Sequence, residues 1–319
     1  MKKLMAMVLM GTMMATLFTG CGSAQETATS TTAGSTVAES TGTMEESTDG
    51  ESALLKEIKE RGYINIATSN DAPFCYYDVD TNELKGLDVD ILKEICNRLG
   101  IPEVRAQVTD FSNMLLELNN KNVDMVADAM YIKDERLEVA LFTDVWYTES
   151  EAVTVKEDSP ITSKEDLKDA VMGAQTGAAM YEMAQKWKDE GKIKDLVGYE
   201  NQATLMTAVN TGKVDAVVTD GILSAYAIEQ DSNLKLRLLT PYEAEAVGRI
   251  GAAIRFEDKD FLEEVNGALN SMKEDGTLMD ILASYGLNED YFIGVEEGKT
   301  ENIKSVSYTH LRAHETLMN

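Results

Sequence analysis

A short motif that occurs twice constrains the fold of this chain more than any other feature. Residues 123–128 and 214–220 each hold an apolar run that follows an amphipathic helical pattern and a short polar turn, and each ends in an aspartate. The pattern predicts a buried strand that ends in a carboxylate. In an open α/β sheet, ligands bind outside the carboxyl ends of the strands. Two such units predict two similar lobes whose sheet edges face each other across a cleft.

The elements expected around the first motif follow a β-α-β-α-β order. Strands are expected near 63–68, 104–108 and 123–127, and helices at 87–99 and 111–119. This order predicts a doubly wound lobe around a parallel sheet.

The second motif belongs to a second lobe of the same kind. Its strands are expected at 151–155, 171–174, 197–199 and 214–218, with helices that begin near 178, 201 and 221. Three more elements are expected to return to the first lobe, namely a strand at 251–255 and helices near 259–274 and 277–285. The chain then crosses between the lobes near 147–152 and again near 246–251, and two crossovers make a hinge. The predicted fold class is therefore α/β, with two doubly wound Rossmann-like lobes joined by a two-strand hinge.

The N-terminus has the pattern of a targeting segment. Lys2 and Lys3 precede an apolar stretch at 4–19, which is short for a membrane span. The stretch runs into Phe18-Thr19-Gly20-Cys21, which resembles the lipobox of bacterial lipoproteins although Phe18 stands where Leu is usual. The resemblance implies cleavage before Cys21 and lipidation of that residue, and so an extracytoplasmic protein anchored to the cell membrane.

The segment after Cys21 is expected to be a flexible tether. Residues 22–51 contain 13 Ser or Thr and no Lys or Arg. Such a composition buries too little apolar surface to offset the entropy of ordering the chain.

Charge and residue usage exclude several function classes. The formal net charge of −27 argues against nucleic-acid binding, which depends on Lys and Arg at the phosphates, and is more typical of a solvated acidic surface. Both histidines, His310 and His314, lie near the end of the chain, so the body lacks the commonest general base and metal ligand. No metal site is expected. Cys75 and Cys96 are expected to be unpaired core residues, although a disulfide is possible outside the cytoplasm.

From Tyr63 to Phe292 the chain resembles the periplasmic binding protein type II family, and in particular the solute-binding subunits of polar amino-acid ABC importers. The resemblance rests on the order and spacing of several short fragments, which are Asp71-Ala72-Pro73-Phe74, Gly86-Leu87-Asp88-Val89-Asp90, Asp110-Phe111, Val123-Asp124-Met125-Val126, Asp134-Glu135-Arg136, Phe142-Thr143-Asp144, Trp146-Tyr147, Val214-Asp215-Ala216-Val217 and Asp275-Gly276-Thr277.

The resemblance implies how a zwitterion is bound. Arg136 stands where the family places an arginine that forks onto the ligand carboxylate, a geometry that a planar guanidinium matches and an ammonium does not. Asp220 aligns with the carboxylate that binds the ligand ammonium, although an aspartate there is also a good N-cap for the following helix. Thr176 and Gly177 open a helix in the second lobe, where the family completes the carboxylate site with backbone N–H groups. The alternative role for Arg136 is an ion pair on the surface, and for Thr176 and Gly177 a simple turn.

The aromatic positions are less typical of amino-acid binders. Phe74, Phe111 and Tyr131 match positions of aromatic walls, or else serve as core residues. Tyr131 replaces the usual small hydroxyl residue, and Ala129 replaces the usual glycine, which puts the standard carboxylate cradle in doubt. Asp71, Arg136 and the three aromatic residues also resemble the pattern of a subgroup that binds ectoine and hydroxyectoine, although Asp220 does not fit that pattern well. Asp71 has an alternative role as a cap of the turn before Pro73.

The sequence thus predicts a monomeric receptor that needs no cofactor, captures a zwitterionic polar amino acid, closes by hinge motion and delivers the ligand to ABC permease subunits. The alternatives are an ectoine receptor and, less favoured, a dehydratase-like enzyme with Asp71 as its acid. The last residues, 305–319, break the composition of the chain and resemble a translated sequencing adaptor, so we expect them not to belong to the native protein. The predicted organisation is a signal peptide at 1–20, a linker at 21–51, lobe 1 at 52–148, lobe 2 at 149–248, the rest of lobe 1 at 249–293 and a tail at 294–319.

Overall fold

The computed structural model describes residues 50–245 and 247–302 of the chain. The predicted signal peptide, Cys21, nearly all of the predicted linker and the segment 303–319 lie outside the described residues. Within the described part, no helix combines the length and the apolar character that crossing a membrane requires.

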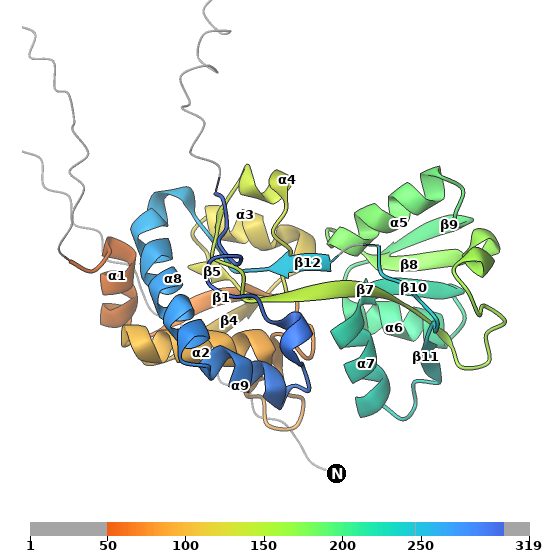
Figure 1. Cartoon of the computed structure of the whole chain (residues 1–319), viewed down its shortest axis with the longest axis horizontal. Helices are drawn as coiled ribbons and strands as arrows, with labels where there is room; N and C mark the ends of the chain where they lie inside the picture. Colours follow the sequence, from red (N-terminus) through yellow and green to blue (C-terminus); the bar gives the residue numbers. More distant parts are fainter. Residues whose placement is uncertain (1–49, 246, 303–319) are drawn as a thin grey trace, which may run out of the picture. The chain divides into compact units, whose positions relative to one another are not determined.

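One five-stranded sheet forms the first lobe (Figure 1), and its strands are β1 (Ile64–Thr68), β4 (Val104–Val108), β5 (Met125–Val126), β6 (Leu141–Phe142) and β13 (Ala253–Ile254). The order across the sheet is β4-β1-β5-β13-β6. β1 pairs in parallel with β4 and β5, whereas β13 pairs antiparallel with β5 and β6. The parallel arrangement expected of β1, β4 and β5 is therefore confirmed. The returning strand β13, whose direction the sequence did not predict, runs antiparallel to its neighbours.

The second sheet contains β7 (Tyr147–Lys156), β8 (Val171–Gln175), β9 (Asp195–Tyr199), β10 (Ala216–Asp220) and β11 (Leu236–Leu238), and β12 (Val247–Ile250) pairs with β7. β8 lies between β9 and β10 and is parallel to both, as a doubly wound lobe requires. β7 enters from the first lobe and runs antiparallel to β10.

Two antiparallel strands connect the lobes. Residues 147–150 of β7 pair with β12, and residues 151–155 pair with β10. Figure 1 shows β7 and β12 running between the two halves of the molecule. The structure therefore has the two-strand connection expected of a hinge.

The helices flank the two sheets and are α1 (Ala53–Arg61), α2 (Leu87–Leu99), α3 (Met114–Asn119), α4 (Asp134–Leu137), α5 (Ala179–Asp189), α6 (Gln202–Asn210), α7 (Gly221–Gln230), α8 (Lys259–Glu274) and α9 (Thr277–Ser284). α8 packs on α1 and α2, and α9 packs on α2, so the C-terminal helices lie with the first lobe. α2 has the bounds that its sequence pattern predicts, and it ends at Gly100 in the left-handed conformation. The short β2 (Tyr76–Tyr77), β3 (Leu84–Lys85), α1, α4 and β6 were not predicted from the sequence.

The two cysteines of the body are free, and both side chains are buried. Cys96 lies on the inner face of α2 beside Ile95 and Leu92, which confirms its predicted role as a small apolar core residue.

Gly86 is the residue at which the chain turns into α2. Its φ is +131°, and a Cβ atom there would lie 2.1 Å from the carbonyl oxygen of Phe74. That carbonyl accepts a hydrogen bond from Asp88 N at 3.0 Å. The missing side chain at Gly86 thus lets the start of α2 pack directly on the turn that carries Phe74.

We predict that Gly86→Ala destabilises the protein by at least about 2 kcal/mol, because the new methyl group meets backbone atoms and the backbone conformation suits glycine. Gly267→Ala is the matched control, since Gly267 lies within α8 and a methyl group there would meet no neighbouring atom within 4 Å. Alanine there should leave stability unchanged or raise it by up to about 1 kcal/mol. Chemical denaturation of both variants measures the difference, and equal effects of the two substitutions would contradict this account.

Candidate functional site

The carboxyl ends of the two sheets meet at a small cavity. Asp128 follows β5 in the first lobe, and Asp220 ends β10 in the second, so the twin motifs deliver their carboxylates to one place. The cavity is lined by Asp71, Phe74, Phe111, Asp128, Ala129, Tyr131, Gln175, Ala178, Ala179, Met180, Asp220 and Leu223. Its volume is about 10 Å³, which is room for about one water molecule. A larger ligand therefore requires the two lobes to move apart.

Six of the residues singled out from the sequence line this cavity, namely Asp71, Phe74, Phe111, Ala129, Tyr131 and Asp220. The other three, Arg136, Thr176 and Gly177, are not among its lining residues but lie beside it. Arg136 bonds to Tyr131 and Gly177, and Thr176 follows Gln175, which lines the cavity.

Arg136 lies in the short helix α4 and connects the two lobes. Its guanidinium donates to the carbonyl oxygen of Tyr131 at 2.7 Å and to that of Gly177, in the second lobe, at 2.9 Å. It also lies over the ring of Phe111, with 5.5 Å to the ring centre. Burial lowers the pKa of Arg136 to about 10, so the group remains a cation at neutral pH. Two bonds leave three of the five guanidinium N–H donors for a ligand.

Thr176 and Gly177 form the loop of the second lobe that approaches the first. The Thr176 hydroxyl donates to the carbonyl oxygen of Tyr199 at 3.2 Å and so is held within its own lobe. Gly177 has φ of +82°, and a Cβ atom there would lie 2.8 Å from the Cα atom of Ser112. The loop therefore meets the first lobe through its backbone.

Asp220 precedes α7 but does not cap it with its side chain. Glu149 of β7 takes that place, since its Oε1 accepts from Ile222 N at 3.2 Å. Asp220 and the Tyr131 hydroxyl lie near each other, but Asp220 Oδ1 and that hydroxyl are buried without a hydrogen bond of ordinary geometry among the described residues. Burial raises the pKa of the Asp220 carboxyl to about 7, and the pKa of Glu149 also lies well above its usual range because of burial and the nearby charge of Asp220.

Ala129 stands in a backbone conformation that explains why glycine is common at its position. Its φ is +46°, in the left-handed region that a side chain disfavours. The backbone N–H of Ala129 donates to Asp88 Oδ2 at 2.5 Å, and the Tyr147 hydroxyl donates to Asp88 Oδ1 at 2.7 Å. These two bonds hold the loop that carries both Asp128 and Tyr131.

Sequence reasoning missed two polar residues that reach this site, Ser69 and Gln175, and it placed Asp128 at the edge of the sheet without assigning it a role. Gln175 Nε2 donates to Asp71 Oδ2 across the lobes at 3.3 Å, and Gln202 Nε2 donates to Gln175 Oε1 at 2.8 Å. Asp71 therefore faces the second lobe and does not cap its own turn with its side chain. Asp128 was recognisable as the aspartate that ends the first motif. Ser69 and Gln175 carried no signal of their own, because serine and glutamine are common in loops.

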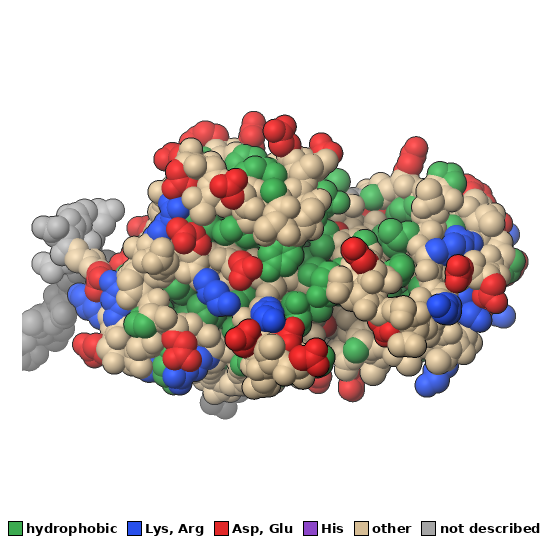
Figure 2. Space-filling model, turned by 90° about the horizontal axis from the view of Figure 1, so that it is seen from below, with side chains coloured by type: hydrophobic (Ala, Val, Ile, Leu, Met, Phe, Trp, Pro, Cys, Tyr) green, Lys and Arg blue, Asp and Glu red, His purple; other side chains and the backbone are tan. Residues whose placement is uncertain are grey.

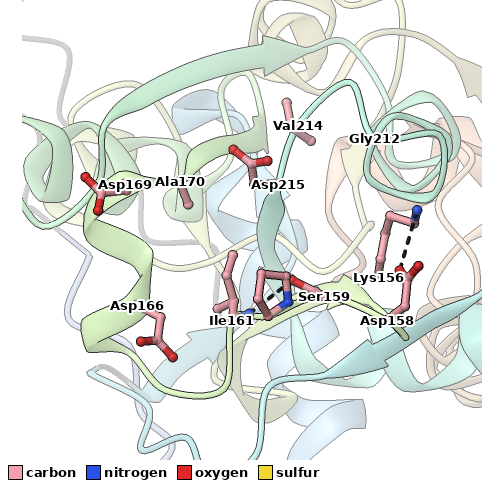
Figure 3. Close-up of a pocket in the computed structure, with 11 residues that line it drawn as sticks. Lys156, Asp158, Ser159, Ile161, Asp166, Asp169, Ala170, Gly212, Val214 and Asp215 are labelled. Carbon is pink, nitrogen blue, oxygen red and sulfur yellow. Dashed lines mark hydrogen bonds and ion pairs between the residues drawn. The ribbon is translucent and has the colours of Figure 1, made fainter.

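A wider pocket lies on the second lobe, away from this site (Figure 3). It has a volume of about 480 Å³ and lies at the amino ends of β8 and β10, next to Ala170 and Asp215. Its acidic side chains serve local structure, since Asp166 Oδ2 accepts from Ser163 N at 2.9 Å and Asp215 Oδ2 from Val171 N at 2.8 Å. Ligands of open α/β sheets bind at the opposite ends of the strands, so this pocket is not the candidate site.

Comparisons with known proteins agree with this geometry. The L-cystine-binding protein TcyA of Bacillus subtilis (strain 168) is 31% identical over 235 residues, which cover 72% of this chain and 82% of that protein. The solved structure of an ancestral arginine-binding protein bound to arginine aligns with a TM-score of 0.64 and 28% identity, and covers 70% of this chain and 98% of that one. The ancestral amino acid-binding protein AncCDT-1, described as a precursor of cyclohexadienyl dehydratase, aligns with a TM-score of 0.63 and 28% identity, and covers 73% of this chain and 98% of that one.

The profile of one family matches residues 64–288, which span both sheets and the connection between them. On this match and on the two-lobed fold with its site between the sheet edges, the chain belongs to the bacterial extracellular solute-binding proteins, family 3.

Proposed function

We propose that this protein is a lipid-anchored receptor that binds a zwitterionic polar amino acid outside the cytoplasm and delivers it to the permease of an ABC importer. The family supports solute binding, and the relatives named above for cystine and arginine support an amino acid as the ligand. They do not favour the ectoine alternative.

The observation that carries the proposal is the pairing of opposite charges at one buried site. The guanidinium of Arg136 is 9% exposed and lies beside the cavity, while Asp220 is 8% exposed and lines it. Opposite charges on the two lobes match the carboxylate and the ammonium of an amino acid. In this assignment Arg136 binds the carboxylate of the ligand, and Asp220 binds its ammonium group.

Capture follows from the connection between the lobes. In this closed conformation a few polar contacts join them directly, including Arg136 to Gly177 and Gln175 to Asp71. Strands β7 and β12 pair antiparallel where the chain passes between the sheets, so a change in their backbone angles moves one lobe against the other. The ligand enters when the lobes are apart and is enclosed when they close.

A dehydratase-like activity is the second candidate, and Asp71 is the observation behind it. Burial raises the pKa of Asp71, as a general acid requires, and one structural neighbour is described as the precursor of a dehydratase. That neighbour is itself an amino acid-binding protein, so we propose binding without catalysis. Incubation with prephenate-like cyclic acids, followed by a search for the dehydrated product, distinguishes the two.

The first prediction of this proposal concerns the anchor. Because Cys21 is the lipidation site implied by the motif, Cys21→Ser should release the protein from the membrane fraction and abolish labelling with a fatty-acid probe. Fractionation of cells that produce the wild type and the variant measures both effects. A variant that stays labelled and membrane-bound would show that the anchor lies elsewhere.

The second prediction concerns Arg136. Arg136→Ala should weaken binding of the amino acid by about 30- to 5000-fold, since losing one partner of a buried charge pair costs about 2–5 kcal/mol. Arg136→Lys should recover little of this, because an ammonium lacks the planar fork. Arg105→Ala is the control, since Arg105 pairs with Glu103 on the surface. Titration calorimetry measures the affinity of each variant for the amino acid. If Arg136→Ala binds within about threefold of the wild type, Arg136 is not the residue that binds the ligand carboxylate.

The third prediction concerns pH. Asp220 has a folded pKa of about 7 against an ordinary value of 3.8, so the folded protein keeps a proton that the unfolded chain has lost. The contribution of this carboxyl group to the free energy of unfolding is therefore fully present below about pH 4, and it is lost as the pH rises through about 7. Asp220→Asn should raise the free energy of unfolding of the ligand-free protein at pH 8 by about 1–3 kcal/mol and flatten its dependence between pH 5 and 8. Urea denaturation over this range tests it, and a variant less stable than the wild type at pH 8 would contradict it.

A further inference from the structure

The cavity contains more negative charge than an amino-acid backbone neutralises. Three aspartates line it, Asp71, Asp128 and Asp220, and no Lys or Arg is among the described residues of its wall. On the proposed function, the carboxylate of the ligand pairs with Arg136 and the ammonium pairs with Asp220. Asp71 and Asp128 are then left without a counter-charge.

Asp71 and Asp128 lie together around one hydroxyl group. Ser69 Oγ is 2.5 Å from Asp71 Oδ2 and 2.9 Å from Asp128 Oδ2. A serine hydroxyl has one proton, so it donates to one of these carboxylates at a time. Asp71 Oδ2 also accepts from Gln175, and Asp128 Oδ2 also accepts from the Thr68 hydroxyl at 3.2 Å. Two carboxylates around one hydroxyl repel each other unless a proton or a cation lies between them.

Asp128 has an oxygen available for such a cation. Its Oδ2 accepts from the backbone N–H of Ser69 at 2.6 Å, whereas its Oδ1 has no hydrogen-bond partner among the described residues. The side chain is 1% exposed and lines the cavity. A buried, unpaired carboxylate oxygen is costly unless a ligand group pairs with it.

The remaining wall suits the rest of such a ligand. Phe74 and Phe111 on the first lobe present aromatic rings, and Met180 and Leu223 on the second present flexible apolar side chains. Aromatic faces attract cations, and apolar side chains pack on a methylene chain.

We propose that the ligand is an amino acid whose side chain ends in a nitrogen cation, and that Asp71 and Asp128, joined by Ser69, bind that cation. This inference rests on the proposed function and adds the specificity of the site. Arg136 and Asp220 recognise what all amino acids share, while the Asp71–Asp128 pair selects a basic side chain. Both an ammonium group and a guanidinium group are nitrogen cations of this kind, and a comparison of lysine with arginine distinguishes them.

The experiment compares ligands of equal shape and different charge by titration calorimetry. L-Arginine and L-citrulline have side chains of almost the same size, but the first is a cation and the second is neutral; L-lysine and L-glutamine are added. We expect arginine or lysine to bind at least about tenfold more tightly than citrulline and glutamine, because the neutral side chains leave two carboxylates unpaired. Which of the two cations binds better distinguishes a guanidinium from an ammonium site.

Variants then assign the preference to its residues. Asp128→Asn and Asp71→Asn should each weaken binding of the basic ligand by at least about tenfold and change binding of glutamine by less than about threefold. Asp124→Asn is the matched control, because Asp124 is a buried aspartate at the other end of the same motif and pairs with Arg61. The Asp124→Asn variant should bind the four amino acids with the same order of affinities as the wild type. Thermal melting establishes that each variant is folded, and either cavity variant suffices for the test.

The outcomes separate the two claims. If a neutral amino acid binds as tightly as arginine and lysine, the cation site is wrong and the proposed function stands. If none of the four amino acids binds, the cation site is wrong, and the proposed function is also wrong unless another polar amino acid, such as L-cystine, binds. If arginine or lysine is preferred but both cavity variants keep that preference, the specificity lies elsewhere and the inference is overturned.

Discussion

The carboxylate of Asp88 connects three parts of the molecule on which the site depends. It lies in the first turn of α2, accepts from Ala129 N on the loop after β5, and accepts from the hydroxyl of Tyr147 at the start of β7. The group is 1% exposed, and burial raises its pKa to about 6. The bond from Ala129 N helps to hold that residue in a left-handed conformation that would otherwise be unfavourable. The two hydrogen bonds to Asp88 therefore fix the positions of the start of α2, the loop in the cavity wall and the first strand of the hinge relative to one another.

Buried negative charge is the second constraint, and it links structure to function. Asp71, Asp128 and Asp220 converge from two sheets on a cavity with room for about one water molecule, and burial raises the pKa of each carboxyl group. Closing the lobes over these groups without a counter-ion is unfavourable, since a charge loses its hydration and gains no partner. On the inference that the ligand is a cation, its binding removes that cost. The groups that weaken the empty closed state would then favour closure around the ligand and so couple binding to hinge motion.

The charged side chains on the outer surface, unlike those in the cavity, remain in contact with water. Figure 2 shows acidic and basic side chains interspersed over the face in view. Exposed ion pairs such as Lys259 with Glu263 contribute little to stability because water screens them. The carboxylates to which the proposed function assigns recognition are the few that are taken out of water.

Much of the fold followed from local patterns in the sequence. The bounds of α2 were predictable because its apolar residues recur with helical spacing up to Gly100. The aspartates at the ends of the twin motifs were predictable as neighbours, since parallel strands place their carboxyl ends at one edge. The short strand β6 was not predicted, because two residues carry no periodicity. β13 was predicted as a strand, but its antiparallel pairing is set by the returning chain.

The sequence by itself therefore determined the two lobes, the crossing points and six of the residues that line the cavity. Only the tertiary structure decided which hydrogen bonds those residues make. It placed Ser69 between Asp71 and Asp128, turned Asp71 towards Gln175, and gave the capping role at α7 to Glu149 in place of Asp220. Apart from the contact between Ser69 and Asp71, each of these contacts joins groups that lie 59 or more residues apart in the sequence. Spacing along a chain determines which face a residue occupies, but packing determines which atom it meets.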